Sequence, residues 1–164
     1  MLYPAQLYKE ELKRKLVENW YDPRCQWYFS GYFHEHTVPD NLDWEQDFVQ
    51  IGSDGSVIGY FGYSYDECSK SIRNIGLISF TDDKTYRMSL CYDAIKRIKY
   101  LFEIGAQRLE FWAFADNPIT GTYQKLIMKH GGYIAGVLHR TAYFNGRYHD
   151  SVFFELLAEN IKGW

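Results

Sequence analysis

The sequence predicts a mixed α/β fold, with helices on both faces of a mainly antiparallel sheet that contains one central parallel pair. Strand-like patterns come first, at 45–52, 56–66 and 71–80. A helical pattern over 84–102 and a strand pattern over 109–115 follow, and this strand–helix–strand unit implies two parallel strands. Asp54-Gly55 and Asn145-Gly146 are turn signals of β-hairpins, so the strands on either side of each are expected to be antiparallel.

The first expected element is an amphipathic helix over residues 5 to 20. Leu12 and Leu16 recur at helical spacing, charged side chains lie between them, and Asp22-Pro23 ends the pattern. Residues 27 to 47 are irregular, first aromatic and then acidic. This composition suits either a second short helix or a long loop over a pocket, and the sequence leaves both open.

The helix over 84–102 has both of its ends marked. Asp82 or Asp83 can cap its first turn, and Gly105 can end it. Its apolar face is expected to consist of residues at helical spacing: Cys91, Ile95, Ile98 and Phe102. The period of the hydrophobic pattern therefore changes from that of a strand to that of a helix after residue 80.

A second strand–helix step follows. Leu109 to Ala115 has strand character, and Asn117-Pro118 provides an N-cap with proline at the first helical position. We expect this helix to run to about His130, where Gly131-Gly132 ends it. The last two strands are expected near 133–144 and 148–157.

Length and composition fit one soluble domain over residues 1–164. Hydrophobic residues make up 46% and charged residues 24%, a mixture too apolar for disorder and too interrupted by charge for a membrane span. The net charge of −3 argues against nucleic acid as the main partner. The charged N-terminal region lacks the pattern of a secretory signal, so a cytoplasmic location is expected. Cys25, Cys68 and Cys91 form no C-x-x-C pair, which favours reduced thiols over a zinc site.

Two motifs carry a resemblance to a known family. The run 105–118 reads GAQRLEFWAFADNP, and the closing hairpin at 145–150 reads NGRYHD. In both, the chain resembles the GNAT superfamily of N-acetyltransferases, especially its ribosomal-protein N-terminal acetyltransferases, whose strand before the pantetheine-side helix reads G-A-x-R-[LV]-E-x-x-[VA]-x-x-x-N. The resemblance covers residues 55 to 157, whereas residues 1 to 50 share with the family only a helical segment before the sheet.

The resemblance implies an acyltransferase of the GNAT fold that uses acetyl-CoA as co-substrate and requires no metal. In such an enzyme a neutral primary amine attacks the acetyl thioester directly, and an acid protonates the departing thiolate. The acceptor would be a peptide N-terminus or a small amine. A homodimer is compatible with this reading, and neither a membrane nor nucleic acid is expected as a partner.

The donor site is expected at the end of the third strand and the start of the helix over 84–102. A strand can pair through its backbone with the peptide-like pantetheine arm, and the N–H groups at a helix start favour a pyrophosphate. The cofactor-binding residues predicted on the strand are Leu77, Ile78, Ser79 and Phe80. The family's pyrophosphate loop, [QR]-x-x-G-x-[GA], is missing, and the residues aligned with it are Arg87, Met88, Ser89, Leu90 and Cys91.

Arg87 stands where the family has a small residue. Its guanidinium fork suits a phosphate, but it could also obstruct the approach of a cofactor or lie in solvent. The sequence leaves these alternatives open. It leaves open as well a second function, that of a catalytically silent GNAT-fold module that binds a ligand or partner without transferring acyl groups.

Tyr123 is the predicted catalytic acid. The resemblance places a tyrosine seven positions after the asparagine of this motif, whereas Tyr123 follows Asn117 by six, a rotation of about 100° on a helix. The run 123–126 nevertheless resembles the family's Y-x-K-L, and Asn117 and Lys125 are predicted to bind the cofactor. The alternatives are a tyrosine packed on the sheet and an asparagine that only caps a helix.

The sequence identifies no general base. Its candidate carboxylates are Glu35, Asp66, Glu67 and Glu110. Carboxylates in turns and on strand surfaces are often simply solvated. His34 and His36 could hold a metal only with a third ligand that the sequence does not offer. A further acidic group either attracts a cationic amine or forms a solvated face: Asp40, Asp43, Glu45 and Asp47.

Overall fold

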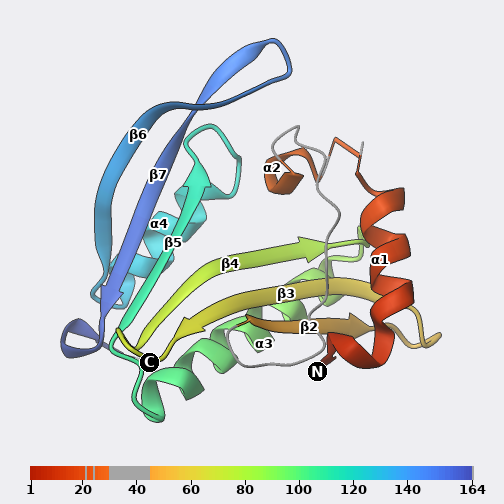
Figure 1. Ribbon diagram of the computed structural model, residues 1–164, viewed down its shortest axis with the longest axis horizontal. Helices are drawn as coiled ribbons and strands as arrows, with labels where there is room; N and C mark the ends of the chain where they lie inside the picture. The colour runs from red at the N-terminus through yellow and green to blue at the C-terminus, as the bar shows by residue number, and fades with distance from the viewer. Residues whose placement is uncertain (21, 24, 30–44, 164) are drawn as a thin grey trace.

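A sheet in the order β1-β2-β3-β4-β5-β7-β6 organises the computed structural model, which describes residues 1–163 except 21, 24 and 30–44 (Figure 1). The strands are β1 (Leu2–Pro4), β2 (Glu45–Ile51), β3 (Val57–Asp66), β4 (Ser71–Ser79), β5 (Arg108–Phe114), β6 (Tyr133–Phe144) and β7 (Arg147–Leu157). The helices are η1 (Ala5–Tyr8), α1 (Lys9–Glu18), α2 (Gln26–Phe29), α3 (Lys84–Glu103), α4 (Thr120–Lys129) and η2 (Ala158–Asn160). Among these described strands β4 and β5 form the one parallel pair, so the predicted fold class is confirmed.

The predicted meander of β2, β3 and β4 is confirmed, and its first turn has a local cause. Gly55 adopts a φ of 83°, and the amide of Gly52 donates to the carbonyl of Ser56 at 2.8 Å. The Asp54 carboxylate accepts from the Ser56 amide at 3.0 Å. Short-range hydrogen bonds therefore fix this hairpin, as the Asp-Gly pair predicts.

α3 begins at the second of the two aspartates that could cap it. The Asp83 carboxylate accepts from the amides of Thr85 at 2.8 Å and Tyr86 at 3.4 Å. The buried residues of the helix are Leu90, Ala94, Ile98 and Leu101. The predicted face is therefore rotated slightly, and Cys91 is exposed instead of packed in the core. Gly105, with a φ of 117°, follows the last turn as expected.

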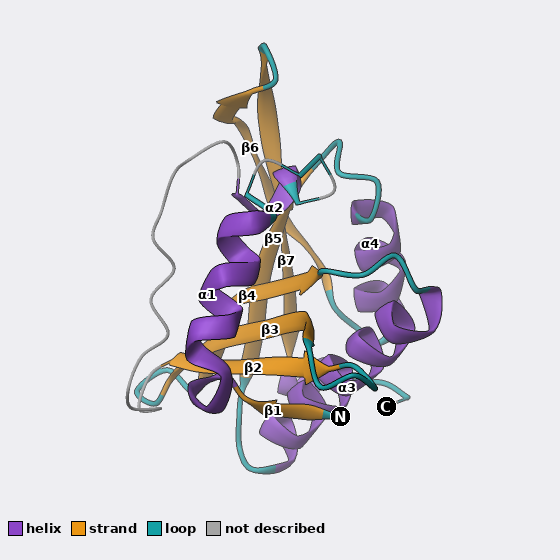
Figure 2. Ribbon diagram, turned by 90° about the vertical axis from the view of Figure 1, so that its right-hand side faces the viewer, coloured by secondary structure: helices purple, strands orange, loops and turns teal. Residues whose placement is uncertain are grey.

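The closing hairpin turns at Asn145-Gly146, as predicted. Both residues have positive φ, 51° and 75°, which is the combination that a type I′ turn requires. β7 pairs with β6 along one edge and with β5 along the other, both antiparallel. The hairpin thus completes the sheet on the side opposite β1 (Figure 2).

Two helices begin later than predicted. The segment 5–20 is not one helix, because Ala5–Tyr8 form a 3₁₀ turn and α1 covers only Lys9–Glu18. Ahead of this segment, β1 pairs with β2. Hydrophobic periodicity cannot reveal that the first residues find partners on a strand edge far along the chain. α4 begins at Thr120, and Asn117 belongs to a separate turn ahead of it.

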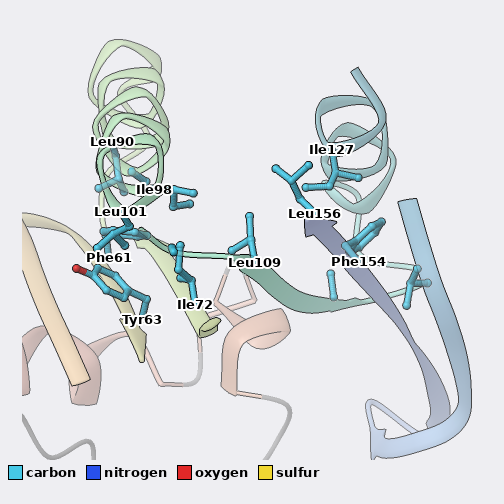
Figure 3. Close-up of a cluster of buried hydrophobic side chains, with 14 residues drawn as sticks. Phe61, Tyr63, Ile72, Leu90, Ile98, Leu101, Leu109, Ile127, Phe154 and Leu156 are labelled. Carbon is cyan, nitrogen blue, oxygen red and sulfur yellow. The ribbon is translucent and has the colours of Figure 1, made fainter. Parts of the chain in front are cut away.

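The helices cover both faces of the sheet, with α3 and α4 on one face and α1 and α2 on the other (Figure 2). Figure 3 shows the buried cluster on the α3 side, which includes Phe61, Ile72, Leu90, Ile98, Leu101, Leu109, Ile127, Phe154 and Leu156. The cluster on the α1 side includes Leu12, Leu16, Val49, Tyr60 and Ile78. β4 therefore has packed side chains on each of its faces. No helix of the described residues combines the length and apolarity needed to cross a membrane.

Candidate functional site

β4 and β5 lie side by side only where they begin. Their paired positions are Ser71 with Arg108 and Ile72 with Leu109. Beyond these positions the strands run apart (Figure 1). Within the described residues, the rest of β4 has a strand neighbour only on its β3 side. The other edge of β4 therefore offers backbone N–H and C=O groups to a ligand.

A β-bulge bends β4 where it leaves β5. Asn74 and Ile75 together stand opposite the single residue Tyr63 of β3. Asn74 has a φ of 51°, and its side-chain amide donates to the Oγ of Ser64 at 3.2 Å. Bulges bend the strand that carries them and increase its twist. This bulge accounts for the separation of β4 from β5.

The four cofactor-binding residues predicted at the end of the third strand divide into two kinds, and Phe80 lies just beyond the end of β4. The Phe80 amide donates to the Ile58 carbonyl of β3 at 2.9 Å. Because amides alternate along a strand, Ile78 also directs its amide towards β3, whereas Leu77 and Ser79 direct theirs towards the open edge. Leu77 and Ser79 are thus the two predicted residues whose backbone can meet a ligand.

The residues that align with the pyrophosphate loop lie inside α3. The Arg87 amide donates to the Asp83 carbonyl at 3.1 Å, and the amides after it lie within the helix. Leu90 is 1% exposed and belongs to the core. The side chains of Arg87, Met88 and Cys91 are exposed, and that of Ser89 is half-buried. These positions therefore offer side chains, and no free amides, to a ligand.

The start of α3 already carries a negative charge. The Asp83 carboxylate occupies the amides of Thr85 and Tyr86, which a bound phosphate would otherwise contact. Lys84 and Arg87 are exposed on the first and second turns and can offset this charge. The residues present therefore fit the pantetheine arm of CoA well and its diphosphate only in part.

Tyr123 belongs to α4, and its side chain lies near Phe111 of β5 and Cys91 of α3. Its ring packs edge-on against Phe111 at a centroid distance of 5.7 Å. Burial, and secondly the nearby Cys91 thiol, raise the pKa of Tyr123 to about 12. The described residues give its hydroxyl no hydrogen-bond partner. Tyr123, six positions after Asn117, therefore lies on the sheet side of α4. Its raised pKa keeps the hydroxyl protonated at neutral pH.

Asn117 caps a turn and not α4 itself. Its Oδ1 accepts from the Ile119 amide at 3.2 Å, and its carbonyl accepts from the Thr120 amide at 2.9 Å. The predicted cap therefore lies two residues before the observed N-cap, Ile119. Lys125 is exposed on α4. The cofactor roles of Asn117 and Lys125 stay predictions.

Two of the described candidate bases, Glu110 and Asp66, are engaged elsewhere. Glu110 pairs with Arg73 at 3.1 Å and also with Arg108. Hydrogen bonds from the 66–69 turn, led by that of Ser69, lower the pKa of Asp66. Glu67 is exposed in the same turn. Residues 34–36, 40 and 43 lie outside the described residues, as does the side chain of Glu45.

A buried carboxylate, Asp47, was not recognised from the sequence as a candidate base. It is 5% exposed, so it forms no solvated face, and Tyr60 Oη donates to its Oδ1 at 2.6 Å. Gly62 and Gly76 make room for this pair on neighbouring strands. The sequence signal that could have indicated this contact is the pair of glycines within the two strand patterns. A glycine inside a strand often marks a position that another group approaches closely.

Comparison with known proteins finds likeness in structure alone. No protein-family model matches the sequence, and no curated protein is significantly similar to it. An acetyltransferase from Salmonella typhimurium that modifies the N-terminal serine of ribosomal protein L7/L12 matches with a TM-score of 0.67 at 16% identity, over 95% of this chain and 93% of that one.

Two further solved structures extend this likeness. A GCN5-related N-acetyltransferase from Brucella melitensis matches with a TM-score of 0.65 at 21% identity, over 97% of this chain and 76% of its own. A spermidine N-acetyltransferase from Vibrio cholerae, in complex with CoA and spermine, matches with a TM-score of 0.64 at 16% identity, over 98% and 96%. The chain therefore has the fold of the GCN5-related N-acetyltransferases, the GNAT superfamily that its sequence motifs resemble.

Proposed function

We propose that this chain is an N-acetyltransferase that moves the acetyl group of acetyl-CoA to a primary amine by direct attack. The observation that carries the proposal is the open edge of β4, where β5 separates from it and the amides of Leu77 and Ser79 have no strand partner among the described residues. An edge of this kind matches the amide groups of a pantetheine arm.

Each part of the site has a distinct role in this proposal. The Leu77 amide steadies the negative charge that develops on the thioester oxygen, since a preorganised N–H donor is most effective where charge develops. The Tyr123 hydroxyl donates its proton to the departing sulfur. Its raised pKa of about 12 keeps the proton available at neutral pH. The side chains of Arg87 and Lys84 hold the diphosphate of acetyl-CoA. Asn117 and Lys125 bind other parts of the cofactor.

The acceptor we propose is a primary amine of a peptide N-terminus or a polyamine. The similar structures from Salmonella typhimurium and Vibrio cholerae act on an N-terminal serine and on spermidine, respectively. A buried carboxylate on the α1 side, Asp47, suits a cationic acceptor. We propose that one domain, as a monomer or a homodimer in the cytoplasm, carries the whole reaction.

One observation favours a second function, a catalytically silent module of the same fold. The Asp83 carboxylate caps α3 where the donor's diphosphate would lie, and like charges there weaken binding. Such a module would bind a ligand or partner without acyl transfer. Donor binding separates the two functions.

Calorimetric titration with acetyl-CoA is the first test. Binding supports the enzyme, whereas no heat at high micromolar acetyl-CoA contradicts it and favours the silent module. Spermidine and a peptide that begins with serine then serve as acceptors, with thiol release as the readout.

Tyr123→Phe tests the proposed acid. We expect kcat to fall on the order of 100-fold with little change in acetyl-CoA affinity, because only the proton donor is lost. Tyr143→Phe is the matched control, since Tyr143 is 60% exposed near the β6–β7 turn. An unchanged kcat for Tyr123→Phe removes Tyr123 from the mechanism.

A further inference from the structure

A chain of hydrogen-bonded hydroxyl groups ends on the buried carboxylate of Asp47. Tyr60 Oη donates to Asp47 Oδ1 at 2.6 Å, and Tyr28 of α2 is hydrogen-bonded to Tyr60. Since the Tyr60 proton points at Asp47, Tyr28 donates its own proton to the Tyr60 oxygen. The order of donation is therefore Tyr28, Tyr60, Asp47, with the carboxylate as the final acceptor.

Burial and ring packing hold the hydrogen-bonded side chains of Tyr28, Tyr60 and Asp47 in place. Tyr60 is 4% exposed and Asp47 5%, and the rings of Tyr28 and Tyr60 pack edge-on at 6.2 Å. Burial raises the pKa of Tyr60 well above its ordinary value, and that of Tyr28 to about 12. Among the described residues, Tyr28 and Asp47 act electrostatically on Tyr60, and Tyr60 and Asp47 act on Tyr28.

The outer end of the chain lies over the open part of β4. A Cβ atom built on Gly76 would come within 3.0 Å of Tyr28 Oη. Gly76 immediately precedes Leu77, whose amide faces the open edge. Tyr28 thus sits next to the place where the proposed reaction occurs.

Tyr28 and Tyr123 lie on opposite faces of the sheet. Tyr28 packs against the cluster on the α1 side, and Tyr123 packs against the cluster on the α3 side. The helices that carry them, α2 and α4, cover opposite faces of the sheet (Figure 2). A direct transfer needs one group that takes a proton from the nitrogen and another that gives a proton to the sulfur. The proton would therefore leave the nitrogen on one face of the sheet, and the sulfur would receive its proton on the other face.

On the basis of the proposed function, we propose that Tyr28, Tyr60 and Asp47 form the relay that removes a proton from the attacking amine. As the nitrogen lone pair forms the bond to the carbonyl carbon, the nitrogen becomes cationic and loses one proton to the Tyr28 oxygen. Tyr28 passes its own proton to Tyr60, and Tyr60 passes its own to Asp47. Collapse of the tetrahedral species breaks the C–S bond, and the thiolate takes a proton from Tyr123; solvent later restores both groups.

In this relay only Tyr28 touches the substrate. Tyr60 and Asp47 act through it, so they are positioning and proton-accepting residues behind it. Two other described carboxylates near β4, Glu110 and Asp66, are paired with Arg73 and so do not compete for this role.

Asp47→Asn and Tyr28→Phe test the relay on the full chain. Asparagine keeps an oxygen that can accept the Tyr60 proton in a hydrogen bond but cannot take it up, and phenylalanine keeps the ring on Gly76. With acetyl-CoA and spermidine or a peptide beginning with serine, we expect kcat near neutral pH to fall on the order of 100-fold in both variants. The KM for acetyl-CoA should stay within twofold, and the deficit should shrink as pH rises, because hydroxide can take the proton instead.

Tyr63→Phe is the matched control. Tyr63 is a buried tyrosine of the same strand, and its hydroxyl accepts from Arg97 Nε at 3.0 Å on the α3 side. It should keep the wild-type kcat and pH profile. A kcat deficit that is the same at every pH, or an unchanged kcat in Tyr28→Phe, overturns the relay alone. Donor binding without turnover in the wild type overturns the relay together with the proposed function.

Discussion

At the scale of single residues, Gly62 supports the buried pair above it. A Cβ atom at this position would meet Tyr60 Oη at 2.2 Å and Asp47 Oδ1 at 2.8 Å. Gly62→Ala forces these atoms apart, and we expect the free energy of unfolding to fall by about 1–3 kcal/mol. Gly136→Ala on β6 is the control, because a Cβ there meets nothing within 4 Å. Urea denaturation of both variants decides the point, and equal stabilities would contradict this account of Gly62.

Which side chains meet at this scale could not be predicted from the sequence. Asp47 was one member of an acidic group, and its contact with Tyr60 depends on how β2 and β3 are paired in register. Tyr123 was predicted as an acid, and its packing on Phe111 is compatible with that role and with the alternative of a sheet-packed tyrosine. Local sequence does not determine contacts between strands or between a helix and a strand, because packing selects them.

At the scale of elements, the proposed donor site puts the diphosphate of acetyl-CoA at the start of α3. The Asp83 carboxylate caps the helix by accepting from Thr85 and Tyr86. We expect Asp83→Ala to cost about 1 kcal/mol of stability through the lost cap, and to tighten acetyl-CoA binding by removing a negative charge near the diphosphate. Thermal denaturation and calorimetry measure the two effects separately.

Glu103→Gln provides the control for this prediction. It removes the same charge at the other end of the same helix, where Glu103 is exposed. Its acetyl-CoA affinity should equal that of the wild type. Weaker acetyl-CoA binding by Asp83→Ala would contradict a diphosphate site at the start of α3.

Elements with local signals were predicted well. Asp83, Asp54-Gly55 and Asn145-Gly146 mark their cap and turns through bonds or dihedral angles within a few residues. β1 was missed because its three residues are a strand only through pairing with β2. The bulge at Asn74 was missed for the same reason, since a bulge is defined by the partner strand.

At the scale of the whole molecule, buried tyrosines link stability to alkaline pH. Burial raises the pKa of Tyr28 and of Tyr123 from the ordinary 10.0 to about 12. Between these values the unfolded chain releases protons that the folded protein keeps, so the free energy of unfolding falls as pH rises. The contribution is fully present below pH 10 and amounts to roughly 2–3 kcal/mol for each tyrosine.

Urea denaturation at about pH 9 and about pH 11.5 measures this effect. Tyr123→Phe should lose less stability over that interval than the wild type, because it lacks one of the linked groups. Tyr143→Phe, altered at an exposed side chain, should follow the wild type. Identical losses in all three proteins would contradict the raised pKa of Tyr123.

The sequence by itself determined the order of most elements, the turns, the α3 cap and the resemblance to GNAT acetyltransferases. These depend on hydrophobic period and on hydrogen bonds between near neighbours, which a short stretch of chain specifies. The tertiary structure alone decided that β4 leaves β5 at a bulge, that Asp83 charges the start of α3, and that Asp47 ends a buried chain through Tyr60 to Tyr28. Those features arise where distant segments pack, and burial acts on side chains only after packing has placed them.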